Sequence, residues 1–300
     1  MFNRDANYYI ETKHRKIPGF LHDEAINIDR KTVSSFGEEW SKFNAFSEAE
    51  IESQAIHYFD IIPPGLLTKS TVLADFGCGS GKFSKYMSRK AGTVYSIDPS
   101  KAILVADEML AGTGNVVLCQ ASISDLPFED QYFDFGMSIG VLHHIPDSAQ
   151  AMKDCVQKIK VGGHFLTYIY YSFDNRGWTF KAIWKMSEIV RRIVSSLPPK
   201  LKLFASDVLA LVVYMPLILF SRFLKVVGVA PSIWKKIPLS VYVDKSFFII
   251  RNDCLDRFGT PLEKRFSKNE IRTMMSNAGL GEILFSDQPG YWHAIGKRIV

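Results

Sequence analysis

Cysteine is scarce in this 300-residue chain, which has four, at positions 78, 119, 155 and 254. They form no Cys-x-x-Cys pair and have no histidines at zinc-binding spacing, so the sequence argues against a disulfide framework and predicts no metal site. Buried, reduced thiols are the simplest interpretation, and they favour a reducing compartment. We therefore expect a cytoplasmic protein.

Long uncharged runs are also missing. Residues 1–5 are polar with no apolar core behind them, so no secretory signal is expected. The segment 208–220 has thirteen residues without a charge, fewer than the ~20 that a membrane-spanning helix needs, and it contains Pro216. Asp207 and Arg222 bracket it closely. We expect a buried or membrane-dipping helix there, not a transmembrane segment.

Internal repeats, low-complexity tracts and RNA-binding motifs are absent as well. The formal net charge is +5, but residues 174–240 contain eleven basic and three acidic side chains, a local net charge of +8. Aliphatic residues, not stacking aromatics, are interleaved with these cations, so no nucleic-acid partner is expected.

Three alternating glycines follow an apolar run in the segment 72–81, which reads Val-Leu-Ala-Asp-Phe-Gly-Cys-Gly-Ser-Gly. The run predicts a buried strand, and the residues after Gly81 predict a helix. Gly77, Gly79 and Gly81 can adopt positive φ angles at the turn and, lacking a Cβ, let the backbone approach a ligand closely. The segment therefore indicates a nucleoside-binding loop.

Further strands follow at the spacing of an α/β nucleotide-binding fold. A second strand, 93–97, ends at Asp98, 21 residues after Gly77, where a carboxylate could accept hydrogen bonds from both ribose hydroxyls. Two more strands complete the pattern: 116–119, which leads to Ser122 and Ile123, and 133–139, which leads to the turn Val-Leu-His-His-Ile-Pro-Asp at 141–147.

These segments resemble class I S-adenosylmethionine (SAM)-dependent methyltransferases of the ubiquinone/menaquinone-type and small-molecule group. The resemblance covers 71–170 and resumes at 266–298. It implies SAM as the cofactor and S-adenosylhomocysteine as the product. The residues that it implies for the cofactor are Asp75 near the amino group, Gly77, Cys78, Gly79 and Gly81 around the methionine part, Asp98 and Pro99 at the ribose, Ser122 and Ile123 beside adenine, and Ile139 and His144. Many relatives have Asp in place of Ser122, so Asp125 is an alternative partner for the adenine amine.

A dinucleotide dehydrogenase is the nearest competing family. Its fingerprint needs Gly-x-Gly-x-x-Gly, and Lys82 stands where the last glycine would be. Segments 281–286 and 291–297, joined by a turn at 288–290, indicate a hairpin, which matches the antiparallel last strand of the methyltransferases. We predict an α/β fold with a Rossmann-like, seven-stranded sheet of order 3-2-1-4-5-7-6, its last strand antiparallel, and a helical cap insertion.

The chain is expected to have four parts: an N-terminal arm and helix (1–70), a SAM-binding core (71–171), a basic and apolar cap insertion (172–265), and a C-terminal helix and hairpin that complete the core (266–300). Capping boxes, Ser47 with Glu50 and Ser267 with Glu270, predict two helix starts. The remaining core elements are helices at about 81–90, 101–111 and 147–160, and a turn at Gly162 and Gly163 into a fifth strand, 164–170.

The insertion contains a predicted helix, 178–197, with two faces. The apolar face has Phe180, Ile183, Trp184, Val190, Ile193, Val194 and Leu197, and the charged face has Lys181, Lys185, Glu188 and Arg192. Two interpretations stay open: the helix packs on a core, or residues 175–236 make peripheral contact with the anionic inner face of a membrane. Residues 246–250 have a strand-like pattern and are expected to close over the site.

SAM supplies its own electrophilic methyl group, so the protein must align the acceptor, exclude water and remove a proton where needed. His143 and His144 follow the fourth strand, at the sheet edge where ligands bind, and either could be the general base. A purely structural turn is the alternative for both, and Asp147 fits a helix N-cap. Tyr168 and Tyr170 end the fifth strand and could face an acceptor or simply pack.

Together these patterns predict a SAM-dependent methyltransferase that acts on a small or lipid-linked acceptor, for which an anionic group is one option. Oxygen is the expected methylated atom, with carbon or nitrogen as alternatives. Two alternatives stay open. One is C-methylation of a quinone or polyprenyl lipid at a membrane, and the other is a SAM-binding protein that has lost catalysis.

Overall fold

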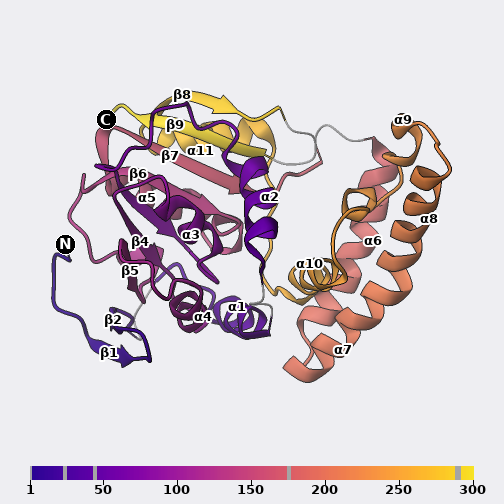
Figure 1. The fold of residues 1–300 in the computed structure, drawn as a ribbon, viewed down its shortest axis with the longest axis horizontal. Coiled ribbons are helices and arrows are strands. Elements are labelled where there is room, and N and C mark those ends of the chain that lie inside the picture. Colours follow the sequence, from indigo (N-terminus) through magenta and orange to yellow (C-terminus); the bar gives the residue numbers. More distant parts are fainter. Residues whose placement is uncertain (1, 23–25, 43–45, 174–176, 288–291) are drawn as a thin grey trace. The chain divides into compact units, whose positions relative to one another are not determined.

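The computed structural model describes residues 2–22, 26–42, 46–173, 177–287 and 292–300. The chain divides into two compact units (Figure 1). Unit 1 is Met1–Arg176 with Leu262–Val300, and unit 2 is Gly177–Pro261. The expected insertion, 172–265, encloses unit 2.

A seven-stranded sheet forms the centre of unit 1 (Figure 1). Its order is β5-β4-β3-β6-β7-β9-β8, made by β3 (Val72–Phe76), β4 (Thr93–Ile97), β5 (Val116–Cys119), β6 (Phe133–Ile139), β7 (Ile159–Ile169), β8 (Leu280–Phe285) and β9 (Trp292–Arg298). The strands β3 to β7 pair in parallel, and β9 is antiparallel to both of its neighbours. The predicted sheet order is confirmed, while the predicted turn at 288–290 lies outside the described residues.

Helices cover both faces of this sheet. The helices α2 (Glu48–Phe59), α3 (Lys82–Ser88) and α4 (Ala102–Met109) pack on one face, and α5 (Ser148–Gln157) and α11 (Lys268–Asn277) pack on the other. The central strands are therefore buried on both sides, which explains their nearly uninterrupted apolar sequences. Both predicted capping boxes are confirmed, at the starts of α2 and α11.

The N-terminal arm contains elements that the sequence pattern does not predict. The strands β1 (Tyr8–Glu11) and β2 (Lys16–Gly19) form a hairpin. The hairpin joins the edge of the sheet beyond β5, because the Phe20 N–H donates to the Gln120 carbonyl and the Gln120 N–H donates to the Pro18 carbonyl. A helix, α1 (Arg30–Lys42), follows.

The prediction of a turn at Gly162 and Gly163 is wrong, because β7 begins at Ile159 and both glycines lie within it. Gly162 has a φ of +86°, and the pairing of β6 with β7 shifts register between Phe133 and Phe135. A Cβ on Gly163 would lie 2.6 Å from the Asp134 carbonyl oxygen. The glycines permit an irregular strand, and a glycine pair in a sequence is compatible with either outcome.

The described part of unit 2 is helical. It contains α6 (Trp178–Ser195), α7 (Pro199–Leu209), the π-helical turn η3 (Ala210–Tyr214), α8 (Met215–Val226), α9 (Pro231–Trp234), η4 (Ser240–Tyr242) and α10 (Phe247–Gly259). The elements α7, η3 and α8 form one long helix, Pro199–Val226, in which the π-helical turn accommodates Pro216.

The prediction of a strand-like segment at 246–250 is also wrong. Ser246 is the N-cap of α10, and its hydroxyl accepts a hydrogen bond from the Ile249 N–H. Ile250 packs in a helical core with Val194, Tyr214 and other residues of unit 2. A short run of aromatic and β-branched residues suits a strand by propensity, but tertiary packing selects the helix here.

Candidate active site

The glycine loop lies between β3 and α3, at the carboxyl end of β3, which is an interior strand of the sheet. Gly77, Gly79 and Gly81 have φ angles of +83°, +53° and +78°, which residues with a Cβ rarely adopt. A Cβ on Gly77 would lie 2.4 Å from Cγ2 of Val141. The N–H groups of Gly77 and Cys78 both donate to the Ile97 carbonyl, which fixes the loop against the end of β4. The loop thus presents bare backbone at the ligand-binding edge of an α/β sheet.

Asp98 follows β4 and is buried. Its Oδ2 accepts a hydrogen bond from the Gly79 N–H at 2.9 Å, and its Oδ1 accepts from the Ser100 N–H at 2.8 Å and the Ser100 hydroxyl at 2.6 Å. Burial raises the pKa of this carboxyl, and the three hydrogen bonds oppose that rise. A carboxylate has about four lone-pair positions, so these bonds leave one, on Oδ2, for a ligand hydroxyl. To accept hydrogen bonds from two ribose hydroxyls, the Asp98 carboxylate would have to lose one of its bonds to Ser100 or Gly79.

Asp75 lies two residues before Gly77, and its carboxylate is the last acceptor in a buried series of hydrogen bonds. Its Oδ2 accepts a hydrogen bond from the Ser84 hydroxyl at 2.6 Å, and the Ser84 hydroxyl accepts one from Ser96 at 2.7 Å. Burial raises the pKa of Asp75 to about 7, the bond from Ser84 opposes the rise, and the charge of Asp98 adds to it. A cationic ligand group beside Asp75 would favour the ionised carboxylate, so this position suits the ammonium of an amino acid.

The residues predicted beside adenine lie after β5. Ser122 caps the short helix η1 (Ile123–Asp125), where its hydroxyl accepts a hydrogen bond from the Ser124 N–H, and Ile123 is buried. Asp125 forms an ion pair with Arg4 at 2.6 Å, and its Oδ2 lies at hydrogen-bond distance, 3.0 Å, from Nε2 of His22. The N-terminal arm therefore engages Asp125, which disfavours it as the partner of an adenine amine.

The remaining predicted cofactor residues surround the loop. The Cys78 thiol is buried, and burial raises its pKa well above its ordinary value, so the thiol is protonated and not a nucleophile. The Pro99 carbonyl accepts a hydrogen bond from the Gln120 side chain. Ile139 ends β6 and packs partly buried against the core beneath α2, α3 and α4. None of these three residues has a side chain that could act as an acid, base or nucleophile at the glycine loop.

His143 and His144 lie in the short helix η2 (Leu142–His144) after β6. His143 is fully buried, its Nδ1 accepts a hydrogen bond from the Tyr170 N–H at 3.4 Å, and its Nε2 has no partner in the described part of the chain. Burial lowers the pKa of His143 well below its ordinary value, so its single proton is on Nε2. Nδ1 of His144 lies 2.7 Å from the Leu262 carbonyl and donates to it, which puts the lone pair on Nε2. Of the two, His144 has the hydrogen-bond pattern of a general base.

Aromatic rings gather around these histidines at the carboxyl ends of β6 and β7. His143 stacks on Tyr170 with 3.9 Å between ring centroids, and Tyr168 lies 5.8 Å from Tyr170. Tyr58 of α2 lies 5.0 Å from Tyr168, and Phe36 of α1 lies 4.8 Å from His144. We call these side chains the aromatic cluster: Phe36, Tyr58, His143, His144, Tyr168 and Tyr170. Such a cluster suits contact with a flat, aromatic acceptor.

A third histidine, which the sequence analysis missed, lies beside the aromatic cluster. His293 of β9 is fully buried and pairs with Tyr168 across the sheet. Its Nε2 lies 2.7 Å from Oδ1 of Asp60, and the Ser286 hydroxyl donates to the other oxygen of Asp60 at 2.8 Å. With Nε2–H donating to Asp60, the lone pair is on Nδ1, which has no partner among the described residues. Asp60 and His293 are 233 positions apart, so no local sequence motif could predict their hydrogen bond.

The helix α1 adds further contacts that the sequence pattern does not indicate. The Trp40 indole nitrogen lies 3.0 Å from the position that a Cβ on Gly79 would take. The Thr32 hydroxyl accepts a hydrogen bond from the Leu262 N–H at 3.1 Å. Through these contacts α1 covers the glycine loop and the segment that follows unit 2 in the chain.

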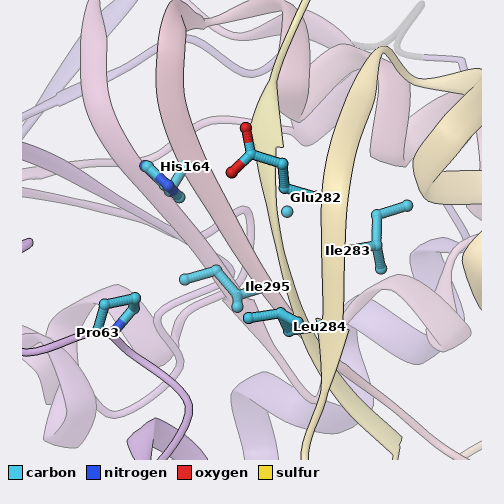
Figure 2. A pocket seen from close by; sticks show the side chains of 7 residues that line it. Pro63, His164, Glu282, Ile283, Leu284 and Ile295 are labelled. Carbon is cyan, nitrogen blue, oxygen red and sulfur yellow. The ribbon is translucent and has the colours of Figure 1, made fainter.

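A separate hollow of about 350 Å³ lies on the sheet away from this edge (Figure 2). It is lined by Pro63, His164, Glu282, Ile283, Leu284, Ile295 and Gly296. His164 lies five residues before the end of β7, which is about 16 Å from the carboxyl edge at the usual rise of a strand. None of the lining residues is predicted for the cofactor, and the hollow is not part of the active site.

Comparisons with known proteins agree with this geometry. A family model described as a methyltransferase domain matches residues 74–167. The ubiquinone biosynthesis O-methyltransferase of Nitrosomonas europaea is 29% identical over 167 residues, which are 52% of this chain and 67% of that protein. The protein of the same name from Paracidovorax citrulli is 30% identical over 165 residues, which are 52% of this chain and 66% of that protein. The matches thus span about two thirds of the length of these relatives.

Among solved structures, human N-acetylserotonin methyltransferase in complex with SAM has a similar fold, with a TM-score of 0.52 and 13% sequence identity. The similarity covers 88% of this chain and 57% of that chain. The residues present fit SAM, because bare backbone, a buried acid before the glycine loop and an acid after β4 meet at one sheet edge. The chain therefore belongs to the class I SAM-dependent methyltransferases.

Proposed function

We propose that this methyltransferase transfers the methyl group of SAM to a phenolic oxygen of an aromatic, lipid-linked acceptor of the quinone-precursor kind. The observation that carries the proposal is the aromatic cluster at the carboxyl ends of β6 and β7. Val141, two residues before His143, lies against Gly77, so the cluster adjoins the glycine loop. The names of the relatives, ubiquinone biosynthesis O-methyltransferases, support an acceptor of this chemistry.

When bound, SAM supplies a methyl group on a positively charged sulfur. The glycine loop would hold its methionine part, with Asp75 at the ammonium and Asp98 at the ribose. The rings of Tyr168 and Tyr170 would align a phenol by stacking. His143, His144 and Tyr168 are buried, which would limit the access of water to the acceptor. The phenol must lose its proton as its oxygen attacks, and Nε2 of His144 or Nδ1 of His293 has the lone pair to accept it.

Turnover with defined acceptors tests this proposal. The full chain is incubated with SAM and a catechol that carries a short isoprenoid tail, and S-adenosylhomocysteine is measured by chromatography. We expect acceptor-dependent turnover and a product whose NMR spectrum shows a methyl group on oxygen. A methyl group on ring carbon would instead establish C-methylation. SAM binding without turnover on any phenol of a series would contradict the proposal and favour a protein that has lost catalysis.

Separate variants distinguish the candidate bases. Substituting the true base, as in His144→Asn or His293→Asn, should lower kcat by about 100-fold or more with little change in KM for SAM. His143→Asn is the comparison variant, because the proton on its Nε2 makes His143 a donor. As a member of the aromatic cluster, it should change KM for the acceptor more than kcat.

A further inference from the structure

Large apolar side chains are exposed along two helices of unit 2. On α6 they are Trp178, Ile183, Met186, Ile189, Val190 and Ile193, and on the long helix Pro199–Val226 they are Leu201, Phe204, Val208, Leu211, Val212, Val213, Leu219, Phe220, Phe223 and Val226. We call these residues the apolar surface. Exposed apolar patches of this extent are uncommon on soluble monomers and mark places of contact with a partner or a membrane.

The helix α6 has three faces, not the two predicted from the sequence. Val194 and Arg191 are buried within unit 2, and the Arg191 guanidinium donates to the Thr260 and Pro261 carbonyls. Ile183 and Ile193, predicted for the same apolar face as Val194, are 57% and 60% exposed. Next to them on the helix surface lie three exposed cations, Lys181, Lys185 and Arg192. An exposed apolar face bordered by cations is typical of helices that lie at the surface of an anionic bilayer.

The long helix continues the same arrangement. Ala210, Tyr214 and Ile218 pack with residues of α10, and Val194 of α6 joins the same core. Both helices therefore pack against α10 with one face and leave another face exposed. The exposed residues extend from Leu201 to Val226, interrupted between Val213 and Leu219, in a stripe about 38 Å long at the rise of an α-helix.

By length and composition the long helix could also cross a membrane. It has 28 residues, and its most apolar 18-residue segment has a mean hydropathy of 2.2 and is 22% buried. Its charged residues favour an orientation in the plane of the bilayer instead. Asp207 pairs with Arg251 of α10 at 2.7 Å, and Arg222 donates to the carbonyls of Val243 and Lys245. The uncharged stretch between them has fourteen residues, or about 21 Å, which is shorter than the ~30 Å hydrocarbon core.

We propose that the apolar surface docks unit 2 in the plane of an anionic lipid bilayer, with its side chains in the acyl boundary. The exposed cations that would meet the lipid headgroups are Lys181, Lys185, Arg192, Lys200, Lys235 and Lys236. Unit 2 carries thirteen basic and five acidic residues, a net charge of +8. This charge favours an anionic membrane over a second copy of the chain, because two such units repel each other. Docking through this surface does not depend on which acceptor unit 1 methylates.

Vesicle flotation tests the docking with the full chain. We expect the wild type to float with vesicles of phosphatidylcholine and phosphatidylglycerol, and less with phosphatidylcholine alone. The triple variant Ile193→Ser, Phe204→Ser, Phe223→Ser should bind about tenfold more weakly to both. The double variant Lys181→Gln, Lys185→Gln should lose most of the preference for the anionic vesicles.

The matched control replaces three apolar residues of similar exposure in unit 1, as Ile56→Ser, Val161→Ser, Leu284→Ser. It should float like the wild type. All variants should bind SAM with wild-type affinity in calorimetry, which separates a loss of docking from a loss of folding or of cofactor binding.

Four outcomes would overturn the proposal. The wild type could stay at the bottom of the gradient with both kinds of vesicle, or the triple variant could float as well as the wild type. Sedimentation could show a dimer that the triple variant abolishes, without vesicle binding, which would make a second copy the occupant. Bound protein that resists extraction by alkaline carbonate would show that the long helix spans the bilayer.

Discussion

At the residue scale, Gly77 meets two separate demands, a positive φ angle and a lack of space for a Cβ. Gly77→Ala should therefore lower the free energy of unfolding by about 3 kcal/mol and abolish SAM binding. Gly112 has a similar φ of +76° but nothing within 4 Å of an added Cβ, so Gly112→Ala should cost only about 1 kcal/mol. Urea unfolding and calorimetry measure both effects. Equal losses in the two variants would show that the contact with Val141 is unimportant.

The pKa of Asp75 makes SAM binding dependent on pH. Burial raises this pKa to about 7, and the carboxyl must ionise to pair with the SAM ammonium. We expect the dissociation constant for SAM to fall several-fold from pH 6 to pH 7.5 in calorimetry. Asp98 is buried with a raised pKa as well, so Asp75→Asn should weaken the pH dependence without removing it. A wild type whose affinity is constant over this range would contradict the assignment.

The Asp75 carboxyl also makes the stability of the fold depend on pH. A rise in pH favours SAM binding but lowers the stability of the protein without SAM. The ordinary pKa of 3.8 applies to the unfolded chain, and the folded value is about 7, so between them the folded chain holds the extra proton. The contribution of Asp75 to stability is therefore complete below about pH 4 and is lost as the pH rises toward 7. Without SAM, the wild type should lose stability relative to Asp75→Asn over this window in urea unfolding.

The three histidines show what the sequence can predict about single residues. His143 and His144 are adjacent and follow an apolar strand, so their place at the sheet edge follows from local pattern. Their different hydrogen bonds depend on the Tyr170 N–H and the Leu262 carbonyl, which only the fold brings near. His293 meets Asp60 through the pairing of β9 with β7, and no spacing in the sequence encodes that contact.

At the scale of elements, α1 is the part of the N-terminal arm that reaches the active site. The Trp40 ring lies against the glycine loop, and the Lys82 ammonium lies 5.2 Å from its centre. Trp40→Ala should raise the dissociation constant for SAM about tenfold in calorimetry, because the loop loses its cover. Trp178→Ala is the matched control, since Trp178 is 80% exposed in unit 2. An unchanged constant in Trp40→Ala would mean that α1 does not shape the cofactor site.

The elements that could be predicted are those whose signals are local. Capping boxes and apolar runs give the helices α2 and α11 and the strands β3 to β6 close to their observed bounds. The predictions for Gly162, for 246–250 and for the faces of α6 are wrong because each depends on what packs against the segment. On α6, apolar residues fill both the packed face and the exposed face, so periodicity alone cannot separate them.

At the scale of the whole molecule, the two units differ in the surface that they present. Unit 2 carries a net charge of +8, so the rest of the chain, at +5 overall, carries about −3. Large exposed apolar residues gather on α6 and the long helix, whereas those of unit 1 are scattered singly. This contrast supports the proposal that cofactor binding and membrane docking belong to different units.

The proposed division of roles between the two units can be tested by deleting unit 2, because both ends of the insertion are held by hydrogen bonds within unit 1. Tyr171 and Phe266 form a parallel bridge, the Ser172 N–H donates to the Phe266 carbonyl, and the Phe266 N–H donates to the Tyr170 carbonyl. These bonds hold both ends within unit 1, so replacing 177–261 by a short Gly-Ser linker should leave unit 1 folded. Because Leu262 and its bond to Thr32 remain, the shortened chain should bind SAM within about twofold of the wild type. It should no longer float with anionic vesicles, and flotation as strong as that of the full chain would place the membrane contact in unit 1 instead.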